Sequence, residues 1–454
     1  MAGPRAGTGD PRPPRKVSVV IPELAPLGAA VAALGDEVLD WRFKAAPAVA
    51  DGYTVSEFLV SGARLSDFGT PLLTLDSRCV AGNIAAMASW CAERGLALAP
   101  HGKTTMAPAL YLAQLEAGAW GITLANEPQV RVGRAFGLPR IHLANALLRP
   151  GALRWLAAEQ AADPSFRFSS WVDSVRAVEL MTDGLPPGAS VDVCVELGVL
   201  GGRTGVRGLA AATAVAQAVA RSPRLRLVGV SGYEGAVAHG TDAGQLSAVD
   251  AYLDDLAALH AAVSPLYDLT TAGRAMVTVG GSAYFDQVAA RLAGLADPEG
   301  TTGPATEVVL RSGAYVIHDD GYYRSVTPST RSDGPAFESA MHAFARVVSQ
   351  PEPGLALLDA GRRDLPFDQG YPEPQLRLRP DAPSISVRGS SITGLNDQHA
   401  FMRVGTGDDV QVGDIIRLGL SHPCTAIDKW TLIPMLADTD ADDPHVVGMI
   451  RTYF

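Results

Sequence analysis

Residues 191–231 read VDVCVELGVLGGRTGVRGLAAATAVAQAVARSPRLRLVGVS and contain one strand–helix–strand unit. Residues 191–196 and 225–231 are short apolar runs rich in valine and leucine, which is typical of buried strands. Between them, the alanine-rich stretch 208–221 predicts a helix. A helix that joins two strands returns the chain to the same end of the sheet, so the unit predicts a pair of parallel strands.

The same unit repeats in both directions along the chain. Strand-like runs occur at residues 97–103, 120–124, 140–144, 166–172, 191–196, 225–231, 276–280 and 306–311. Helical signals lie between them; for example, Pro108 is expected to open a helix that Gly118 closes, and Asp76 or Ser77 to cap a helix over 78–94. Eight such units predict an α/β fold with a closed (β/α)8 barrel of the TIM type rather than an open sheet.

The sequence outside the barrel is organised differently. Residues 312–454 contain strand-like pieces separated by Gly, Pro and Asp, without helical stretches between them, which predicts a C-terminal antiparallel β domain. Residues 1–16 are rich in Pro, Gly and Arg and predict a disordered tail. Residues 17–66 include a strand-like run at 17–24, and we expect this segment to contribute to the β domain. The barrel is therefore predicted to span residues 67–311.

Composition excludes several classes of protein. The chain has 454 residues with 47% hydrophobic and 19% charged residues, which is the balance of a globular protein with a large core. The net charge is -11 and there is no basic run, so we expect no nucleic-acid partner. Apolar stretches are too short to span a bilayer. Four scattered cysteines form no CxxC pair, which favours reduced thiols and a cytoplasmic location.

Lys103 is the first candidate for chemistry. It lies in the segment LALAPHGKTTMAP and is one of only four lysines in the chain. It is expected to end the first barrel strand, at the face where the loops of such barrels build active sites. A partly desolvated lysine there has a lowered pKa, which suits an amine that attacks a carbonyl. The alternative from these residues alone is a surface lysine that merely ends a strand.

A glycine-rich turn, VGGSAYFD, follows the strand at 276–280. Glycines at the end of a strand let backbone N–H groups converge on an anion, so Gly280, Gly281 and Ser282 are candidates to hold a phosphate. A simple strand-to-helix turn would have the same sequence. Another glycine-rich loop, VELGVLGGRTGVR, follows the strand at 191–196.

The segment LSHPCTAIDKW carries a possible metal pair. His422 and Cys424 are separated by one residue, so on an extended strand their side chains would emerge on the same face. Imidazole with thiolate suits Zn²⁺ best. Two protein ligands leave positions for water and substrate, as in a catalytic site; a chance pairing is the alternative.

Three of these motifs together resemble one known family. PHGKT, at residues 100–104, is similar to the lysine motif of the fold-type III pyridoxal-phosphate (PLP) enzymes related to D-threonine aldolase and D-serine dehydratase. GGRTGV, at residues 201–206, resembles a loop shared with alanine racemases, and SHPC, at residues 421–424, resembles the metal motif of the family's C-terminal domain. The resemblance covers about residues 67–454 and implies an alanine racemase-like fold.

The resemblance also implies roles for individual residues. Lys103 would form the Schiff base with pyridoxal 5'-phosphate and take or return the α-proton. Arg203 would lie beside the phenolic oxygen, Tyr233 near the ring, and Gly281 and Ser282 at the phosphate. The other implied contacts are Tyr315 with phosphate or substrate, His101 with the substrate side, and His422 and Cys424 with a divalent metal, Zn²⁺ before Mn²⁺ or Mg²⁺.

The reaction implied is a lyase reaction on a small amino acid with a 3-hydroxyl group. Elimination of water from the D isomer, giving a 2-oxo acid and ammonia, is favoured by the His–Cys pair, and retro-aldol cleavage to glycine and an aldehyde is the alternative. A racemase or a non-catalytic PLP-binding protein is a further alternative. Thr105 and Met106 depart from the family's usual His and Lys, which leaves the substrate side chain open. We expect a homodimer and no membrane partner.

Overall fold

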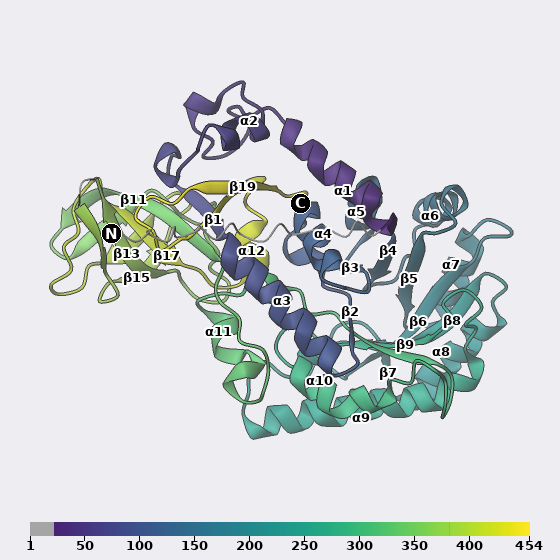
Figure 1. Ribbon diagram of the computed structural model, residues 1–454. Coiled ribbons are helices and arrows are strands. Elements are labelled where there is room, and N and C mark those ends of the chain that lie inside the picture. Colours follow the sequence, from purple (N-terminus) through teal and green to yellow (C-terminus); the bar gives the residue numbers. More distant parts are fainter. Residues whose placement is uncertain (1–21, 381) are drawn as a thin grey trace, which may run out of the picture.

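The computed structural model describes residues 22–380 and 382–454, and its centre is a parallel sheet of eight main strands (Figure 1). The strands are β2 (Ala97–Leu98), β3 (Ile122–Leu124), β4 (Arg140–Leu143), β5 (Arg167–Val172), β6 (Val191–Gly198), β8 (Leu225–Gly232), β9 (Ala275–Val279) and β10 (Thr306–Leu310). A short strand, β7 (Val206–Arg207), pairs with β6. All eight predicted runs are confirmed as strands of this sheet.

The sheet closes on itself through the neighbours of its two end strands. Its order is β2-β10-β9-β8-β6-β5-β4-β3. The N–H of Trp120 donates to the carbonyl of Leu98 at 2.7 Å, and that of Thr123 to the carbonyl of Pro100 at 2.9 Å. His101 and Thr123 form a parallel bridge. These contacts join the β2 segment to β3, and the predicted barrel is confirmed.

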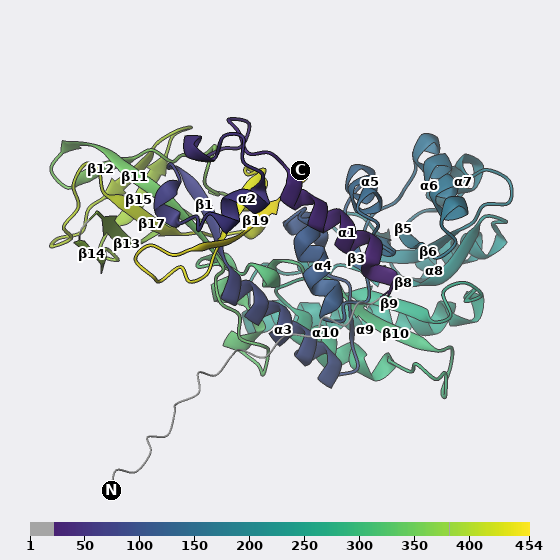
Figure 2. The ribbon, with the colours of Figure 1, turned by 45° about the horizontal axis from the view of Figure 1, so that its top comes forward.

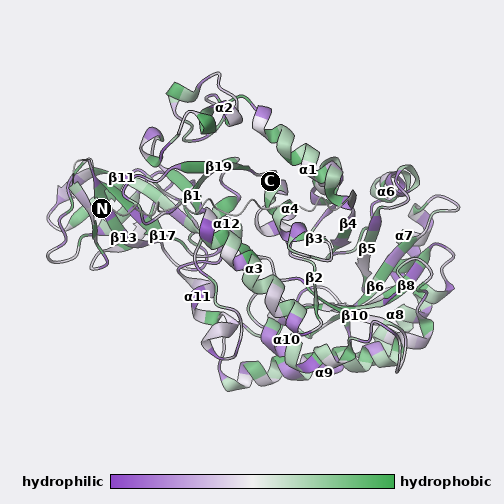
Figure 3. Ribbon diagram, viewed as in Figure 1, coloured by the Kyte–Doolittle hydropathy of each residue, from purple (hydrophilic) through white to green (hydrophobic). Residues whose placement is uncertain are grey.

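Helices cover the outside of the barrel, and their ends follow the sequence signals. They are α3 (Ser77–Glu93), α4 (Pro108–Glu116), α5 (Glu127–Ala135), α6 (Pro150–Ala162), α7 (Val175–Gly184), α8 (Leu209–Arg221), α9 (Ala243–Val263) and α10 (Phe285–Leu292), with short 3-10 turns η5 (Gly102–Thr104), η6 (Glu234–Ala236), η7 (Ser264–Leu266) and η8 (Ala293–Leu295). Asp76 caps α3 by accepting from the N–H of Arg78, and Pro108 opens α4, as predicted. Polar and apolar residues alternate along α9 (Figure 3), and its buried residues, among them Val249, Leu253 and Leu256, recur every three or four positions, so one face of the helix is buried.

The second domain is a ten-stranded, mostly antiparallel sheet. Its strands are β1 (Leu72–Asp76), β11 (Met341–Glu352), β12 (Leu355–Leu358), β13 (Glu373–Arg379), β14 (Ala382–Ser386), β15 (Ser391–Leu395), β16 (Ala400–Arg403), β17 (Ile415–Gly419), β18 (Leu432–Leu436) and β19 (Val446–Arg451). The main path is β14-β13-β17-β11-β1-β18-β19, and β12, β15 and β16 extend from β11. A single short helix, α12 (Pro423–Ile427), lies between β17 and β18.

Two boundaries of the prediction are wrong. Residues 72–76, assigned to the barrel segment 67–311, form β1, which pairs with β11 and β18 of the second sheet. A short, fully buried apolar run looks the same whichever sheet it joins, so the local pattern could not assign it. The second domain also does not start with strands, because residues 312–340 form η9 (Ala314–Val316), α11 (Tyr322–Val326) and η10 (Pro328–Thr330).

The N-terminal segment packs on both domains. Pro22–Leu24 form the 3-10 turn η1 rather than a strand, and the rest of the strand predicted from residue 17 lies outside the described residues, as do residues 1–16. The segment continues as α1 (Ala25–Ala32), η2 (Ala33–Asp36), η3 (Ala48–Ala50), α2 (Val55–Val60) and η4 (Leu65–Asp67). The helix α1 contacts α4 of the barrel and α2 contacts β19, an arrangement visible in two views (Figures 1 and 2). Across the described residues, we find no helix long and apolar enough to cross a membrane.

Candidate active site

Lys103 lies in the turn η5, five residues after β2 ends, rather than on the strand itself. The hydroxyl of Tyr111, from α4, donates to the carbonyl of Gly102 at 2.8 Å and so holds the turn in place. Burial lowers the pKa of Lys103; a negative charge on Cys424 opposes this effect, and the positive charges of Arg203 and Arg311 add to it. The amine at the barrel mouth is therefore biased toward its neutral, nucleophilic form.

Arg311 is a buried cation that the sequence analysis did not single out. It follows β10 directly, and its guanidinium donates to the hydroxyl of Thr278 at 2.8 Å and to the carbonyl of Gly232 at 2.5 Å. The guanidinium also lies over the ring of Trp171, 5.0 Å from its centroid. The only sequence signal was an arginine at the end of a buried strand, TEVVLR, where a charge needs a partner.

His101 shares this charged interior. Its Nδ1 is buried without a hydrogen-bond partner among the described residues. Burial and the nearby positive charges of Lys103 and Arg311 hold the pKa of His101 well below its usual range, so its ring is neutral. The expectation that His101 lies near Lys103 agrees with this electrostatic coupling; its contact with substrate stays a prediction.

The glycine turn after β9 is held by side chains from neighbouring strand ends. The N–H groups of Gly280 and Gly281 donate to the carboxylate of Glu234, at 3.1 and 2.5 Å. The next residue, Ser282, accepts from the N–H groups of Gly313 and Ala314, at 3.2 and 3.1 Å. Two convergent N–H groups beside a hydroxyl form a cradle for an anion, and the sequence analysis missed its Gly313 and Ala314 part.

Arg203 and Tyr233 lie together on the rim. The guanidinium of Arg203 is 4.9 Å from the ring centroid of Tyr233, a cation–π contact between the loops that follow β6 and β8. The Arg203 loop is braced from within, because Arg207 donates to the carbonyls of Gly202 and Arg203 at 3.1 and 2.8 Å. The structure thus brings these two predicted residues to the same mouth of the barrel.

Tyr315 is not brought to this group. It belongs to the main hydrophobic core and is 2% exposed. Its hydroxyl accepts from Nε2 of Gln114 at 2.9 Å, and its ring packs on Phe337 with centroids 5.7 Å apart. The predicted contact of Tyr315 with phosphate or substrate has no support in these interactions.

His422 and Cys424 lie side by side, but not on an extended strand as predicted. His422 has a left-handed backbone (φ 55°), and Pro423 opens the helix α12 immediately after it. Proline fits the first turn of a helix and cannot donate to a sheet, which explains the correction. Burial alone would lower the pKa of His422, but hydrogen bonding and charge from Cys424 and Asp368 raise it to about 9.

Two carboxylates that the sequence analysis missed hold this turn. Asp368 accepts from Nδ1 of His422 at 2.5 Å and from the hydroxyl of Thr425 at 2.7 Å. Asp319 accepts from the backbone N–H of His422 at 2.8 Å and from that of Tyr323 at 2.8 Å. A carboxylate on one imidazole nitrogen leaves the other free for a metal, so the donor set fits a divalent cation. The acidic loop DLPFDQG was the available signal.

The barrel and second-domain groups meet in one cavity. The thiol of Cys424 is 3.4 Å from the hydroxyl of Thr104, the neighbour of Lys103. A cavity of about 310 Å³ is lined by Tyr233, Glu234, Gly281, Ser282, Tyr322, Tyr323 and His422, among others. Within residues 22–380 and 382–454, no three His, Cys, Asp or Glu side chains are grouped to hold a metal, so His422 and Cys424 would share the ion with water or substrate.

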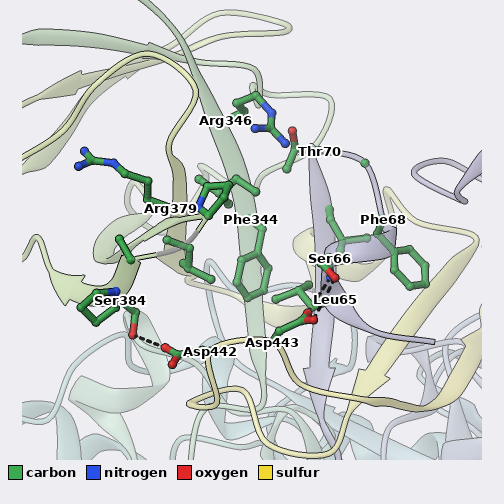
Figure 4. A pocket seen from close by; sticks show the side chains of 17 residues that line it. Leu65, Ser66, Phe68, Thr70, Phe344, Arg346, Arg379, Ser384, Asp442 and Asp443 are labelled. Atoms are coloured by element: carbon green, nitrogen blue, oxygen red, sulfur yellow. Dashed lines mark hydrogen bonds between the residues drawn. The ribbon is translucent and has the colours of Figure 1, made fainter. Parts of the chain in front are cut away.

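A larger cavity, of about 780 Å³, lies against the second sheet (Figure 4). Its floor is apolar and includes Leu72 and Phe344. Of the two arginines that line it, Arg346 and Arg379, the second is paired with Asp414 at 2.7 Å. No predicted site residue lines it, so we assign the active site to the smaller cavity at the barrel mouth.

Comparison with known proteins identifies the family of the chain. Residues 340–436 match the family model described as putative serine dehydratase domain. The chain is 30% identical over 364 residues to D-threonine aldolase from Arthrobacter sp., which covers 80% of this chain and 87% of the aldolase. Among solved structures, D-threonine aldolase from Filomicrobium marinum is 25% identical, with a TM-score of 0.70 over 86% of this chain and 97% of that one. D-threo-3-hydroxyaspartate dehydratase from Delftia sp. HT23 shares the fold, with 21% identity and a TM-score of 0.63 over 85% and 97% of the two chains.

The chain belongs to the fold-type III pyridoxal-phosphate lyases, the family that includes D-threonine aldolase. The resemblance inferred from PHGKT, GGRTGV and SHPC is thereby confirmed, as are the fold class and the class of enzyme. The residues at the barrel mouth fit the cofactor, because they offer an amine of lowered pKa at Lys103 and, at Ser282, an anion cradle that lines the cavity.

Proposed function

We propose that the chain is a PLP- and metal-dependent lyase that eliminates water from a D-3-hydroxy amino acid; the released enamine becomes an imine, which water hydrolyses to a 2-oxo acid and ammonia. The observation that carries the proposal is the position of the His422–Cys424 pair next to the turn of Lys103. The thiol of Cys424 lies 3.4 Å from the hydroxyl of Thr104, the residue that follows Lys103. The amine that would handle the α-proton thus lies beside a pair that can hold a Lewis acid, and His422 of that pair lines the cavity.

Lys103 is the proton-transfer group in this proposal. Bound pyridoxal phosphate supplies an electron sink that makes the α-proton of an amino acid acidic. Arg203 and Arg311 help to keep Lys103 neutral, and a neutral amine can accept that proton. Arg203 and Tyr233 would flank the ring, and the Ser282 cradle would hold the phosphate. His101, buried and neutral, would face the substrate side.

His422 and Cys424 would hold the divalent metal. We propose Zn²⁺, because imidazole and thiolate ligands favour it over the oxygen-preferring Mg²⁺ and Mn²⁺. Such an ion is a Lewis acid that turns hydroxide into a better leaving group. Asp368 orients the imidazole through Nδ1, and Asp319 fixes the backbone of His422. The ligand pair therefore has a preset position opposite Lys103.

Retro-aldol cleavage is the second candidate, favoured by the 30% identity to D-threonine aldolase. The same residues would serve it, but the β-hydroxyl would lose its proton and the bond between Cα and Cβ would break. The products would be glycine and an aldehyde. We propose a homodimer in the cytoplasm for either reaction, because fold-type III sites usually form at a subunit interface.

The deciding experiment is product analysis. The purified protein, loaded with pyridoxal phosphate and Zn²⁺, is incubated with D- and L-isomers of serine, threonine, 3-hydroxyaspartate and 3-phenylserine, and the products are identified by mass spectrometry. A 2-oxo acid with equimolar ammonia from D-isomers supports elimination. Glycine with an aldehyde would show retro-aldol cleavage in place of elimination. Interconversion of the D- and L-isomers without cleavage would overturn both candidate reactions.

A further inference from the structure

Two of the three residues that the sequence assigned to a phosphate, Gly280 and Gly281, have N–H groups that the protein itself already satisfies. Glu234 has no exposed surface, and its two carboxylate oxygens accept separately from Gly280 and Gly281, at 3.1 and 2.5 Å. The carbonyl groups of the same two glycines accept from the hydroxyl of Ser312, at 3.2 Å each. The N–H and carbonyl groups of both glycines are thus engaged by buried side chains, so neither glycine N–H is left for a ligand.

The negative charge of the Glu234 carboxylate is balanced by groups of the protein around it. Besides the two N–H groups, it has Arg311 nearby, whose guanidinium donates to the carbonyl of Gly232, two residues before Glu234. The two charges act on each other, since the negative charge of Glu234 raises the pKa of Arg311 against the lowering by burial. A phosphate dianion on the same N–H groups would lie against this carboxylate and be repelled by it.

The neighbouring cradle is free of that conflict. Ser282 is half-buried, lines the cavity and is the hydrogen-bond acceptor of Gly313 and Ala314. A serine hydroxyl can turn and donate, so it can share an anion with those two N–H groups. Gly313 also packs on the Lys103 turn, since a Cβ there would be 2.5 Å from the carbonyl oxygen of His101. The cradle is thus tied to the turn that carries the amine.

We propose that Glu234 is a positioning residue: a buried internal anion that locks the Gly280–Gly281 turn and thereby sets Ser282 to receive the cofactor's phosphate together with Gly313 and Ala314. This inference rests on pyridoxal phosphate binding, which the proposed function shares, and not on which reaction follows. Glu234 touches neither substrate nor cofactor in this role. Its effect is confined to how well the phosphate end of the cofactor is recognised.

The test compares two cofactors that differ only in phosphate. Protein stripped of cofactor is titrated with pyridoxal phosphate and with pyridoxal, and the ratio of the two Kd values measures phosphate recognition. Glu234→Gln replaces one acceptor oxygen by a donor facing an N–H group, so we expect the Kd of pyridoxal phosphate to rise about tenfold or more and that of pyridoxal to change little. Ser282→Ala should likewise raise the Kd of pyridoxal phosphate more than that of pyridoxal.

The outcomes separate the possible roles. If Glu234 instead occupied the phosphate site and had to be displaced, Glu234→Gln would bind pyridoxal phosphate more tightly, and an unchanged ratio would equally overturn the proposal. Glu307→Gln is the matched control, because Glu307 is a half-buried barrel glutamate bonded to Trp120 and Arg274; its ratio should stay at the wild-type value. If Glu234→Gln does not fold, Ser312→Ala decides in its place, since it removes the other clamp on the turn. A wild-type protein that binds neither cofactor would refute the proposed function instead.

Discussion

The barrel half of the site and the second-domain half hold their functional groups by different means. In the barrel, Lys103, Glu234, Ser282 and Arg311 all follow the carboxyl end of a parallel strand within a few residues. In the second domain, His422 has a left-handed backbone that two carboxylates, Asp319 and Asp368, hold through hydrogen bonds. Strand ends position groups through the repeat of the fold, whereas an isolated turn needs dedicated side chains. We therefore expect changes in the two halves to separate cofactor binding from metal-assisted chemistry.

The largest effect is expected from the barrel half. Lys103→Ala removes the amine that transfers the α-proton, so turnover should fall by at least about 10³-fold, and the visible absorbance of bound cofactor should be lost. Initial rates on the best substrate of the panel and an absorbance spectrum measure both effects. Lys103→Arg keeps a long basic side chain but replaces the amine by a guanidinium that stays charged, so it should be equally inactive; activity in that variant within tenfold of wild type would refute the role of the amine.

A large effect of another kind is expected from the second domain. His422→Ala and Cys424→Ser should each lower turnover by about 10²-fold or more while the absorbance of bound cofactor persists, because the metal acts on the β-hydroxyl and not on the cofactor. Treatment with a chelator should reproduce the loss, and readdition of Zn²⁺, Mn²⁺ and Mg²⁺ in turn ranks the ions. A rate that a chelator does not change would refute the metal-assisted role of the second-domain half of the site.

Asp368→Asn sharpens the comparison one step away from the ligands. Loss of the charged partner of His422 Nδ1 should weaken metal affinity or activity by about 10–100-fold, which is the usual cost of changing the group that orients a metal-bound histidine. A metal titration monitored by activity measures it. Thr425→Val removes the second hydrogen bond to Asp368 and the hydroxyl's longer contacts with Nδ1 and the carbonyl of His422, at 3.2 and 3.3 Å, but it keeps the carboxylate charge and is expected to have a much smaller effect. Equal effects of the two substitutions would mean that the loop, and not the carboxylate charge, matters.

The same contrast explains which features could be predicted from the sequence. The eight barrel strands are local runs with helices between them, so periodicity alone located them, and the lysine motif located Lys103. The strand β1 has an equally clear apolar run, but its partners, β11 and β18, lie far away in the sequence. No local pattern states which sheet a buried strand joins.

Site residues follow the same division. His422 and Cys424 were found because only one residue separates them in the sequence, although proline and the left-handed backbone make their local structure a turn. Three carboxylates were missed: Asp319, Asp368 and Glu234. Each accepts from a backbone or imidazole N–H of a residue far away in the sequence, and no side-chain motif indicates such a partner. Arg311 was visible as a charge at the end of an apolar run, but its partners Thr278 and Gly232 come from two other strands.

The smallest effect is expected at Tyr315, which tests where the barrel half of the site ends. Its hydroxyl accepts from Gln114 in the core, so Tyr315→Phe should cost about 0.5–1.5 kcal/mol in the free energy of unfolding and change turnover by less than about twofold. Urea unfolding and initial rates measure the two quantities on the same preparation. A tenfold loss of turnover with unchanged stability would instead place Tyr315 at phosphate or substrate, as the family resemblance implies. The barrel half of the site would then extend past Ala314 into the core, beyond the residues that line the cavity.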